Sequence, residues 1–427
     1  MNPSSSLSRL ARDRGGSPIS DLMKRALDNP RLISLAAGFV DPASLPLDPT
    51  NRAVDALLGD PALGRRALQY GTTIGDPSLR ARLVRRLERE EDALPGQFEH
   101  VVPRTVVTNG SQQLLYLVAE ALIDPGDVVL VESPTYFVFM GLIEGRGARV
   151  IGVETDEGGL NLEALEETLR RLEAEGDLPR VKLIYTVSEH SNPTGISLAE
   201  GRRGPLVELA NRWSKGHQIF VLEDAAYRGL SFSGREPSSV WRHDEEGRCV
   251  ILARTFSKSF SPGLKTGFGV LPEALVGPVL SLKGDHDFGS NNFAQMVLDR
   301  ALGDGGYDAQ VARLREVYRD KCAVLLGALG EHLGGVEGVS WTVPRGGLYV
   351  WLTVPEWLDT GKAGPLFSRA LEHEVLYVPG CYAFAEEPGP VPNNHARLCF
   401  GVPDEDQLRE GARRLAGALA SCGEQVA

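Results

Sequence analysis

The sequence predicts an α/β fold in which a mostly parallel sheet is sandwiched by helices and followed by a smaller α+β domain. Through the middle of the chain, short runs rich in β-branched residues alternate with longer amphipathic runs, the pattern of buried strands and covering helices. From about Tyr307 the pattern changes to one long helical stretch and then mixed strands and helices. With 427 residues, 42% of them hydrophobic, the chain is long enough for one large core and a smaller one.

Three segments are expected in chain order. Residues 1–50 predict a short helix and an irregular arm, which we expect to pack against the small domain or a partner subunit. Residues 51–305 are expected to form the large domain and residues 306–427 the small one. Six strand-like runs of the large domain, each bounded by turn residues, cover 104–108, 128–133, 149–154, 181–187, 218–224 and 249–255.

The composition limits the partners of the protein. A formal net charge of -12 leaves no excess of Lys and Arg to neutralise phosphates, which argues against nucleic acid and anionic membranes as partners. The N-terminal residues contain no apolar run long enough for a signal peptide or a membrane span, so we expect a cytoplasmic protein. Five scattered cysteines without a CxxC pair predict reduced, buried thiols and no metal site; they are Cys249, Cys322, Cys381, Cys399 and Cys422.

Functional side chains follow the predicted strands, and open α/β sheets bind ligands at the carboxyl ends of their strands. One strand is followed by a glycine and a hydroxyl that open a helix, where backbone N–H groups and the helix dipole suit an anion. Later strands are followed by an aromatic ring, an amide, a carboxylate with a phenol, and a lysine. These residues are Gly110, Ser111, Gln112, Tyr136, Asn192, Asp224, Tyr227 and Lys258.

Together these groups meet the demands of one cofactor, pyridoxal 5'-phosphate. That cofactor needs a lysine amine for a covalent imine and a carboxylate against its ring nitrogen. It also needs donors to its phenolic oxygen, a stacking ring and a phosphate cup. Each group alone is a weak signal, because an Asn-Gly-Ser turn or a single tyrosine is common in proteins without a ligand.

The motifs that carry these residues resemble those of the fold type I pyridoxal-phosphate enzymes, specifically the class I/II aminotransferases. Within that family, the sequence looks most like the branch of 2-aminoadipate and broad-specificity aromatic or aliphatic aminotransferases. The resemblance implies a seven-stranded large-domain sheet. In chain order the motifs are "LQYGTTIGDPSLR", "TNGSQQ", "SPTY", "NPTG", "EDAAY", "TFSKSFSPGLKTG", "PRGGLYVW", "VPG" and "ARLCF".

The resemblance assigns roles around the cofactor ring. Lys258 matches the Schiff-base lysine, which also moves a proton between the substrate α-carbon and the cofactor. Asp224 matches the partner of the ring nitrogen, and Tyr136 matches the stacking ring. Asn192 and Tyr227 match the donors to the phenolic oxygen.

Further matches concern the phosphate and the substrate. Gly110, Ser111 and Gln112 match the phosphate cup, and the resemblance completes this cup with Thr255 or Ser257 and a cation at Lys265. Tyr70 matches a tyrosine that reaches the phosphate of the neighbouring subunit, which implies a homodimer with composite sites. Arg397 matches the residue that binds the substrate α-carboxylate, and Gly38 matches a glycine in an arm that lines the substrate pocket.

The sequence departs from the family pattern at several positions. Lys265 stands where relatives usually have arginine, so a point charge replaces a planar fork at the phosphate. Ser188 and Ser191 replace a proline and a glutamine, which makes the wall beside Asn192 more polar. His190, in the same segment, is either a structural or a substrate-facing side chain. Ser20 stands where some 2-aminoadipate relatives carry an arginine for an acidic side chain.

We therefore expect ping-pong transamination, in which an amino acid gives its amino group to a 2-oxo acid, with 2-oxoglutarate as the expected acceptor. The same scaffold also supports elimination or cyclisation of a hydroxylated amino acid, which stays open. Two weaker alternatives are a non-catalytic binding protein and the effector domain of a transcription factor. The intact Lys258, Asp224 and Arg397 argue against the first, and the missing basic winged-helix segment argues against the second.

Overall fold

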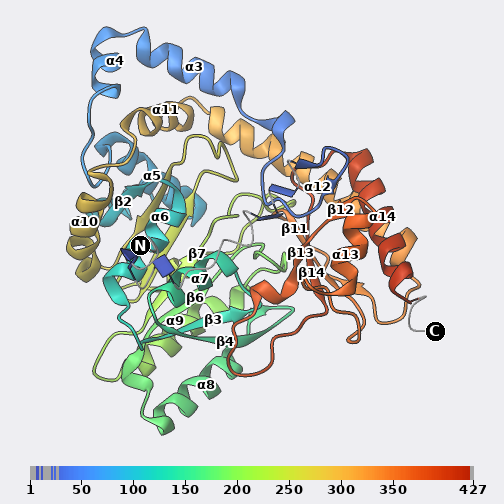
Figure 1. The fold of residues 1–427 in the computed structure, drawn as a ribbon. Helices are drawn as coiled ribbons and strands as arrows, with labels where there is room; N and C mark the ends of the chain where they lie inside the picture. Colours follow the sequence, from blue (N-terminus) through green and yellow to red (C-terminus); the bar gives the residue numbers. More distant parts are fainter. Residues whose placement is uncertain (1–5, 9–10, 13–20, 23, 26–27, 424–427) are drawn as a thin grey trace.

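The computed structural model describes residues 6–8, 11–12, 21–22, 24–25 and 28–423. The large lobe contains a sheet with helices on both sides, and the C-terminal elements form a second lobe beside it (Figure 1). Ser20 and most of the N-terminal helix predicted before residue 28 lie outside the described residues.

The helices and strands of the large lobe alternate along the chain, as the sequence predicts. They are α3 (Leu47–Leu58), α4 (Pro61–Ala67), α5 (Pro77–Glu90), β2 (Thr105–Thr108), α6 (Gly110–Leu122), β3 (Val128–Ser133), α7 (Phe137–Gly145), β4 (Arg149–Asp156), β5 (Gly159–Leu160), α8 (Leu162–Glu175), β6 (Val181–Thr186), α9 (Glu200–Trp213), β7 (Phe220–Asp224), β8 (Val250–Thr255), β9 (Gly267–Val270), α10 (Glu273–Asp287) and α11 (Asn292–Gly303). Side chains cap several of these helices: Asp76, for example, accepts the Ser78 and Leu79 amides at the start of α5.

The large sheet has the strand order β2-β9-β8-β7-β6-β3-β4-β5. The strands β8, β7, β6, β3 and β4 run parallel to one another, whereas β9 is antiparallel to both of its neighbours. The two-residue strand β5 adds a short antiparallel edge to β4. The mostly parallel sheet of seven longer strands is therefore confirmed, with β5 as an extension.

Alternating side chains of the sheet enter two different cores. In β7, Phe220 and Leu222 belong to the core that also contains residues of α6, α7 and the C-terminal lobe. Val221, between them, belongs to the core that contains residues of α5, α8 and α9. Because side chains alternate along a strand, Asp224 continues the first face and Glu223 the second. This alternation decides which polar groups can meet at the carboxyl ends of the strands.

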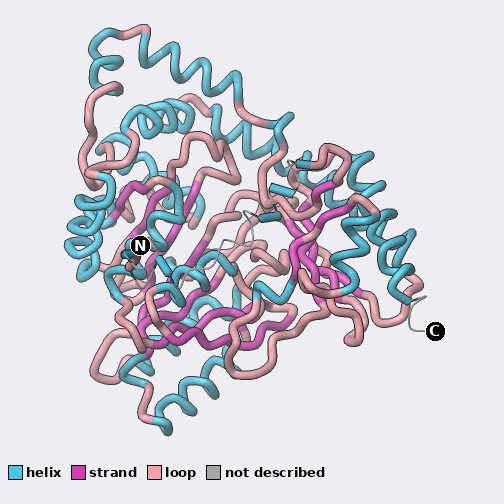
Figure 2. Tube along the Cα trace, viewed as in Figure 1, coloured by secondary structure: helices cyan, strands magenta, loops and turns pink. Residues whose placement is uncertain are grey.

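The C-terminal lobe has its own antiparallel sheet, of order β10-β11-β14-β13, and a separate parallel pair of β1 and β12 (Figure 2). Its elements are α12 (Gly306–Leu333), β10 (Ser340–Trp341), β11 (Tyr349–Thr353), α13 (Pro365–Glu372), β12 (Val375–Leu376), β13 (Val378–Pro379), β14 (His395–Cys399) and α14 (Glu405–Gly423), and the arm contributes β1 (Ile33–Ser34). The smaller α+β lobe is thus confirmed, while the domain boundaries proposed near residues 50 and 305 stay predictions.

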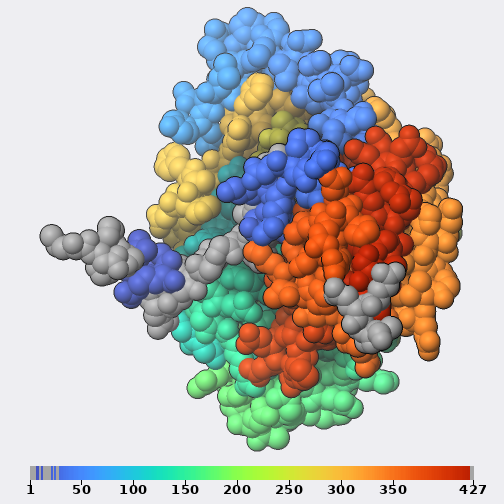
Figure 3. Space-filling view, turned by 45° about the vertical axis from the view of Figure 1, so that its right-hand side comes forward, coloured from blue at the N-terminus to red at the C-terminus, as the bar shows by residue number. Residues whose placement is uncertain are grey.

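The arm that contains β1 lies against the C-terminal lobe, where it appears in dark blue beside orange and red elements (Figure 3). Asp41 fixes it there: its carboxylate accepts Lys321 Nζ at 2.9 Å, and its amide donates to the Tyr318 hydroxyl at 3.1 Å. Both charged side chains are buried. Burying either charge alone would cost much free energy, and the attraction between the two charges offsets this cost.

The five cysteines are free, and all but the partly exposed Cys381 are buried. The predicted burial is therefore confirmed for Cys249, Cys322, Cys399 and Cys422 and is wrong for Cys381. No helix within the described part of the chain is long and apolar enough to cross a membrane. The described residues also contain no group of three His, Cys, Asp or Glu side chains that could hold a metal ion.

Candidate active site

Lys258 follows β8 and reaches the N-terminal arm. Its Nζ donates to the carbonyl oxygen of Gly38 at 2.6 Å. Burial lowers the pKa of Lys258 to about 8, and the nearby cations of Arg397 and Lys265 act in the same direction. A lysine with this pKa is partly neutral near neutral pH, which a nucleophile or a proton carrier requires.

Asp224 ends β7 and is buried with one oxygen free. Tyr185, on the neighbouring strand β6, donates to Asp224 Oδ2 at 2.9 Å. The Ala226 amide lies near the carboxylate, but Oδ1 has no hydrogen-bond partner of good geometry among the described residues. Burial raises the pKa of Asp224 to about 6, even though Tyr185 and Ala226 act in the opposite direction. A buried, unpartnered oxygen of this kind suits a cationic ring N–H.

The start of α6 is where the sequence predicts an anion cup. Gly110 has a φ of +72°, which glycine adopts without strain. A Cβ placed on Gly110 would lie 3.7 Å from Thr255 Oγ1 and 4.0 Å from Ser257 Oγ, so the two hydroxyls stand beside the helix start. The first N–H groups of an α-helix have no intrahelical acceptor, and together with these hydroxyls they can hold a phosphate.

The strand β9 lies directly against the start of α6. A Cβ on Gly267 would lie 2.7 Å from the Gly110 carbonyl carbon and 2.8 Å from the Ser111 amide nitrogen. Only glycine therefore lets β9 pass directly beneath the start of α6. Lys265, two residues before Gly267, is exposed and takes a positive φ of +50°.

Arg397 is buried in β14 and makes contacts on several sides. Its Nη1 donates to Asn192 Oδ1 at 2.8 Å, and its Nη2 donates to the Ala36 carbonyl at 2.7 Å. Its Nε has no partner among the described residues. The guanidinium carbon lies 4.6 Å from the centre of the Tyr349 ring. Arg397 and Asn192, which are 205 positions apart, are thus direct neighbours.

Three tyrosines lie in the neighbourhood of this arginine. Tyr227 and Tyr349 are joined through their hydroxyls at 3.1 Å, and their rings meet edge to face. A Cβ on Gly38 would lie 2.6 Å from the Tyr349 hydroxyl. The Tyr136 hydroxyl lies 3.4 Å from Gln112 Oε1, a long contact toward the cup. Burial raises the pKa of all three phenols, which keeps them neutral donors.

Two predicted residues do not join these contacts within the subunit. Tyr70 is 83% exposed, and its ring packs edge to face on Phe288 with the centroids 5.9 Å apart. His190 is buried, with Nδ1 3.3 Å from Ser197 Oγ and Nε2 3.8 Å from Glu236 Oε2. Gly346 lies directly against its ring, and Gly347 lies against its Cβ. Burial lowers the pKa of His190 to about 4, so it is neutral at physiological pH.

Two tyrosines of the site were missed by the sequence reasoning. Tyr349 lies in the quoted motif "PRGGLYVW" and could have been singled out there. Tyr185 gave no comparable signal, because it reads as an ordinary apolar position of a buried strand.

The geometry of this chain by itself shows that these residues suit pyridoxal phosphate. The free Oδ1 of buried Asp224 suits the ring nitrogen, and the glycine-lined start of α6 suits the phosphate. Lys258 supplies an amine of lowered pKa, and the free Nε of Arg397 offers a further donor near Asn192.

The chain belongs to the aminotransferase class I and II family, whose sequence model matches residues 31–415. Aromatic-amino-acid aminotransferase 1 of Thermococcus litoralis is 33% identical over 94% of this chain and 91% of its own length. The Pyrococcus horikoshii kynurenine aminotransferase, solved in complex with PMP, is 32% identical with a TM-score of 0.89 over 98% of both chains. LysN, an alpha-aminoadipate aminotransferase of Thermus thermophilus solved with N-(5'-phosphopyridoxyl)-L-leucine, is 32% identical with a TM-score of 0.83 over 99% of both chains.

The protein is accordingly an aminotransferase with pyridoxal 5'-phosphate as its cofactor and amino acids as substrates. The predicted family, fold type and class of reaction are confirmed. None of these relatives is named as a lyase or a cyclase, so the elimination alternative gains no support.

Proposed function

We propose that the protein transfers the amino group of an L-amino acid to 2-oxoglutarate or a similar 2-oxo acid, in a homodimer with composite sites. Bound pyridoxal phosphate supplies an aldehyde that takes up the amino group and a ring that withdraws electrons from the substrate α-carbon. The observation that carries the proposal is the convergence of Lys258, Asp224 and Asn192 at the carboxyl ends of the parallel strands β8, β7 and β6. The cytoplasm stays the predicted location.

The proposed roles follow from the contacts of each side chain. Lys258 holds and releases the α-proton, since burial lowers its pKa to about 8. Asp224 would hold the ring nitrogen with Oδ1 while Tyr185 fixes the other oxygen. Asn192 and Tyr227 would donate to the phenolic oxygen, and Tyr136 would stack on the ring.

The phosphate and the substrate engage a second set of residues. Gly110, Ser111, Gln112, Thr255, Ser257 and Lys265 would hold the phosphate, and Tyr70 of the partner subunit would complete the cup. Arg397 would bind the α-carboxylate, to which a guanidinium can offer two parallel hydrogen bonds. Gly38, packed against Tyr349, would line the substrate pocket. The contacts of His190 with Ser197, Glu236 and two glycines favour its structural role.

The test combines spectroscopy with product analysis. Aromatic amino acids, kynurenine and 2-aminoadipate are the first donors to try, because relatives are named for them. In the loaded protein, a donor should replace the cofactor's aldehyde spectrum by that of the amine form and release its 2-oxo acid. Subsequent 2-oxoglutarate should restore the first spectrum and yield glutamate. Release of ammonia without a spectral change would favour elimination and contradict the proposal.

A further inference from the structure

A buried network of charged side chains lies on the face of the large sheet opposite Asp224. Its members are Glu90, Glu91, Glu189, Glu223, Arg203, Arg228 and Arg254. Strand alternation accounts for the placement, because Glu223 follows Val221 onto the second face of β7 and accepts the Val240 and Trp241 amides there. None of these side chains has a role in the proposed reaction.

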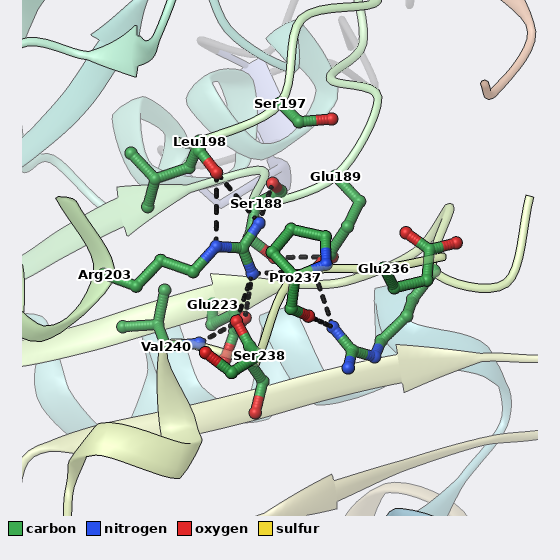
Figure 4. A network of polar contacts seen from close by, with 12 residues as sticks. Ser188, Glu189, Ser197, Leu198, Arg203, Glu223, Glu236, Pro237, Ser238 and Val240 are labelled. Atoms are coloured by element: carbon green, nitrogen blue, oxygen red, sulfur yellow. Dashed lines mark hydrogen bonds and ion pairs between the residues drawn. The ribbon is translucent and has the colours of Figure 1, made fainter. Parts of the chain in front are cut away.

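Glu189 lies at the centre of this network (Figure 4). Its Oε1 accepts Arg203 Nη1 and Arg228 Nη1, each at 2.9 Å, and its Oε2 accepts Ser188 Oγ at 2.6 Å. The side chains of Glu189 and Arg203 are fully buried, and that of Arg228 is 1% exposed. Burial alone would raise the pKa of Glu189, but the two arginines outweigh it and lower that pKa, so the carboxylate is charged.

The contacts continue from Arg228 toward the lysine strand. Arg228 Nη2 donates to Glu91 Oε1 at 2.8 Å, at the end of α5. The adjacent Glu90 accepts Arg254 Nη1 at 2.8 Å, and Arg254 lies in β8. Arg228 Nε also lies 3.7 Å from Glu90 Oε2, so one continuous set of ion pairs connects the segment before Asn192, the segment after Tyr227 and the strand before Lys258. These side chains are buried except for Glu90, which is 19% exposed.

The spacing along the chain makes this connection relevant to the site. Glu189 lies three residues before Asn192, Arg228 directly follows Tyr227, and Arg254 lies four residues before Lys258. A buried ion pair adds little net stability, because desolvation of the charges offsets their attraction. Its hydrogen bonds do fix the relative orientation of the two side chains, because a guanidinium presents its donors in a rigid, planar arrangement.

We propose that Glu189 is a positioning residue, which holds the Asn192 and Tyr227 segments in register by bridging Arg203 and Arg228 behind the sheet. The inference rests on the proposed function, in which Asn192 and Tyr227 donate to the phenolic oxygen of the cofactor. Ser188 donates to the second oxygen of Glu189, so both oxygens of this carboxylate are held.

The test is Glu189→Gln, which keeps the shape of the side chain and removes its charge. The variant should fold, because Arg203 still donates to the Leu198, Ser188 and Ser238 carbonyls. Arg228 likewise keeps Glu91 and the Pro237 carbonyl. Should it not fold, Ser188→Ala removes only one contact of Glu189 and is expected to act in the same direction with a smaller effect.

The first readout is the pH midpoint of the visible absorbance of the bound cofactor. Donors at the phenolic oxygen favour the deprotonated form of the chromophore, so displacing them should raise the midpoint by about half a pH unit or more. The second readout separates kcat from KM: kcat should fall by roughly tenfold to a hundredfold, as expected for a small misplacement of reacting groups, with little change in KM.

Leu169→Ala is the matched control. Leu169 is fully buried in α8, in the core on the network's side of the sheet, and its truncation lowers stability without touching the ion pairs. A midpoint unchanged in Glu189→Gln, or moved equally in Leu169→Ala, would overturn the positioning role. Failure of the proposed function is a distinct result, since wild-type protein would then not convert its cofactor with any donor.

Discussion

Lys258 combines burial with two neighbouring cations, and this combination predicts an unusual titration. In cofactor-free protein, its reaction with an amine-specific reagent should have a pH midpoint of about 8, compared with ~10.4 for an unperturbed lysine. Mass spectrometry of the labelled peptide measures that midpoint. Because the folded pKa is lowered, the unfolded chain binds more protons between these two values, and Lys258 makes stability rise with pH in that range.

Arg397 provides the control for this titration. Its positive charge helps to lower the pKa of Lys258, so Arg397→Gln should move the labelling midpoint upward. A wild-type midpoint near that of an ordinary lysine would show that the amine is not held in a buried, cationic environment.

Gly38 and Tyr349 make a second prediction at the scale of single residues. In Gly38→Ala the new Cβ would lie 2.6 Å from the Tyr349 hydroxyl, so the arm or the ring must move. Overpacking of this kind costs ~1–3 kcal/mol, and we expect a higher KM for the amino acid together with a lower melting temperature. Tyr349→Phe removes the oxygen that would clash. The double variant should therefore recover stability relative to Gly38→Ala, and strictly additive losses would contradict the predicted clash.

At the scale of elements, the contact between α6 and β9 predicts different costs for two glycines. Gly110→Ala finds space but must hold a positive φ of +72°, which costs ~1–2 kcal/mol. Gly267→Ala would press its Cβ against backbone atoms of Arg254, Gly110 and Ser111 at 2.6 to 2.8 Å. We expect Gly267→Ala to weaken cofactor binding far more than Gly110→Ala. Equilibrium titration of each apoprotein with pyridoxal phosphate measures this, and equal affinities would refute it.

The elements also show what the sequence could predict. Six strands were identified because each is a run of β-branched residues between turn signals, and Asp224, Asn192 and Lys258 were found because each follows such a run. The strand β9 was not identified as a separate run, since half of its four residues are glycine, which is rare in strands. The reason for its glycines is the close approach of α6, which only the structure shows.

Side-chain contacts between different strands and segments could not be predicted from the sequence. Tyr185 donates to Asp224 because β6 and β7 are neighbours in a register that pairs Tyr185 with Leu222, two residues before Asp224 on the same face. Neither the neighbour nor the register can be read from a single sequence. The same holds for Glu189 and Arg228, which come from separate segments and meet behind the sheet.

At the scale of the whole molecule, one subunit leaves apolar side chains in solvent around Tyr70. Leu68 is 73% exposed, Tyr70 83% and Phe288 68%, although Tyr70 and Phe288 pack on each other. Large exposed apolar side chains that lie together are typical of interaction surfaces. This observation supports the proposed homodimer, and sedimentation at micromolar concentration should give twice the mass of one chain.

Composite sites make a sharper prediction, which tests whether Tyr70 serves the partner's site. Lys258→Ala and Tyr70→Ala should each have low activity as pure proteins. After equimolar subunit exchange about half of the dimers are hybrids, and one of the two sites in each hybrid has both residues intact, so about one quarter of wild-type activity should return. Lys258→Ala mixed with Arg397→Gln is the control, because those residues serve the same subunit's site and no hybrid site is intact. Equal recovery in both mixtures, or none in the first, would place Tyr70 outside the partner's site.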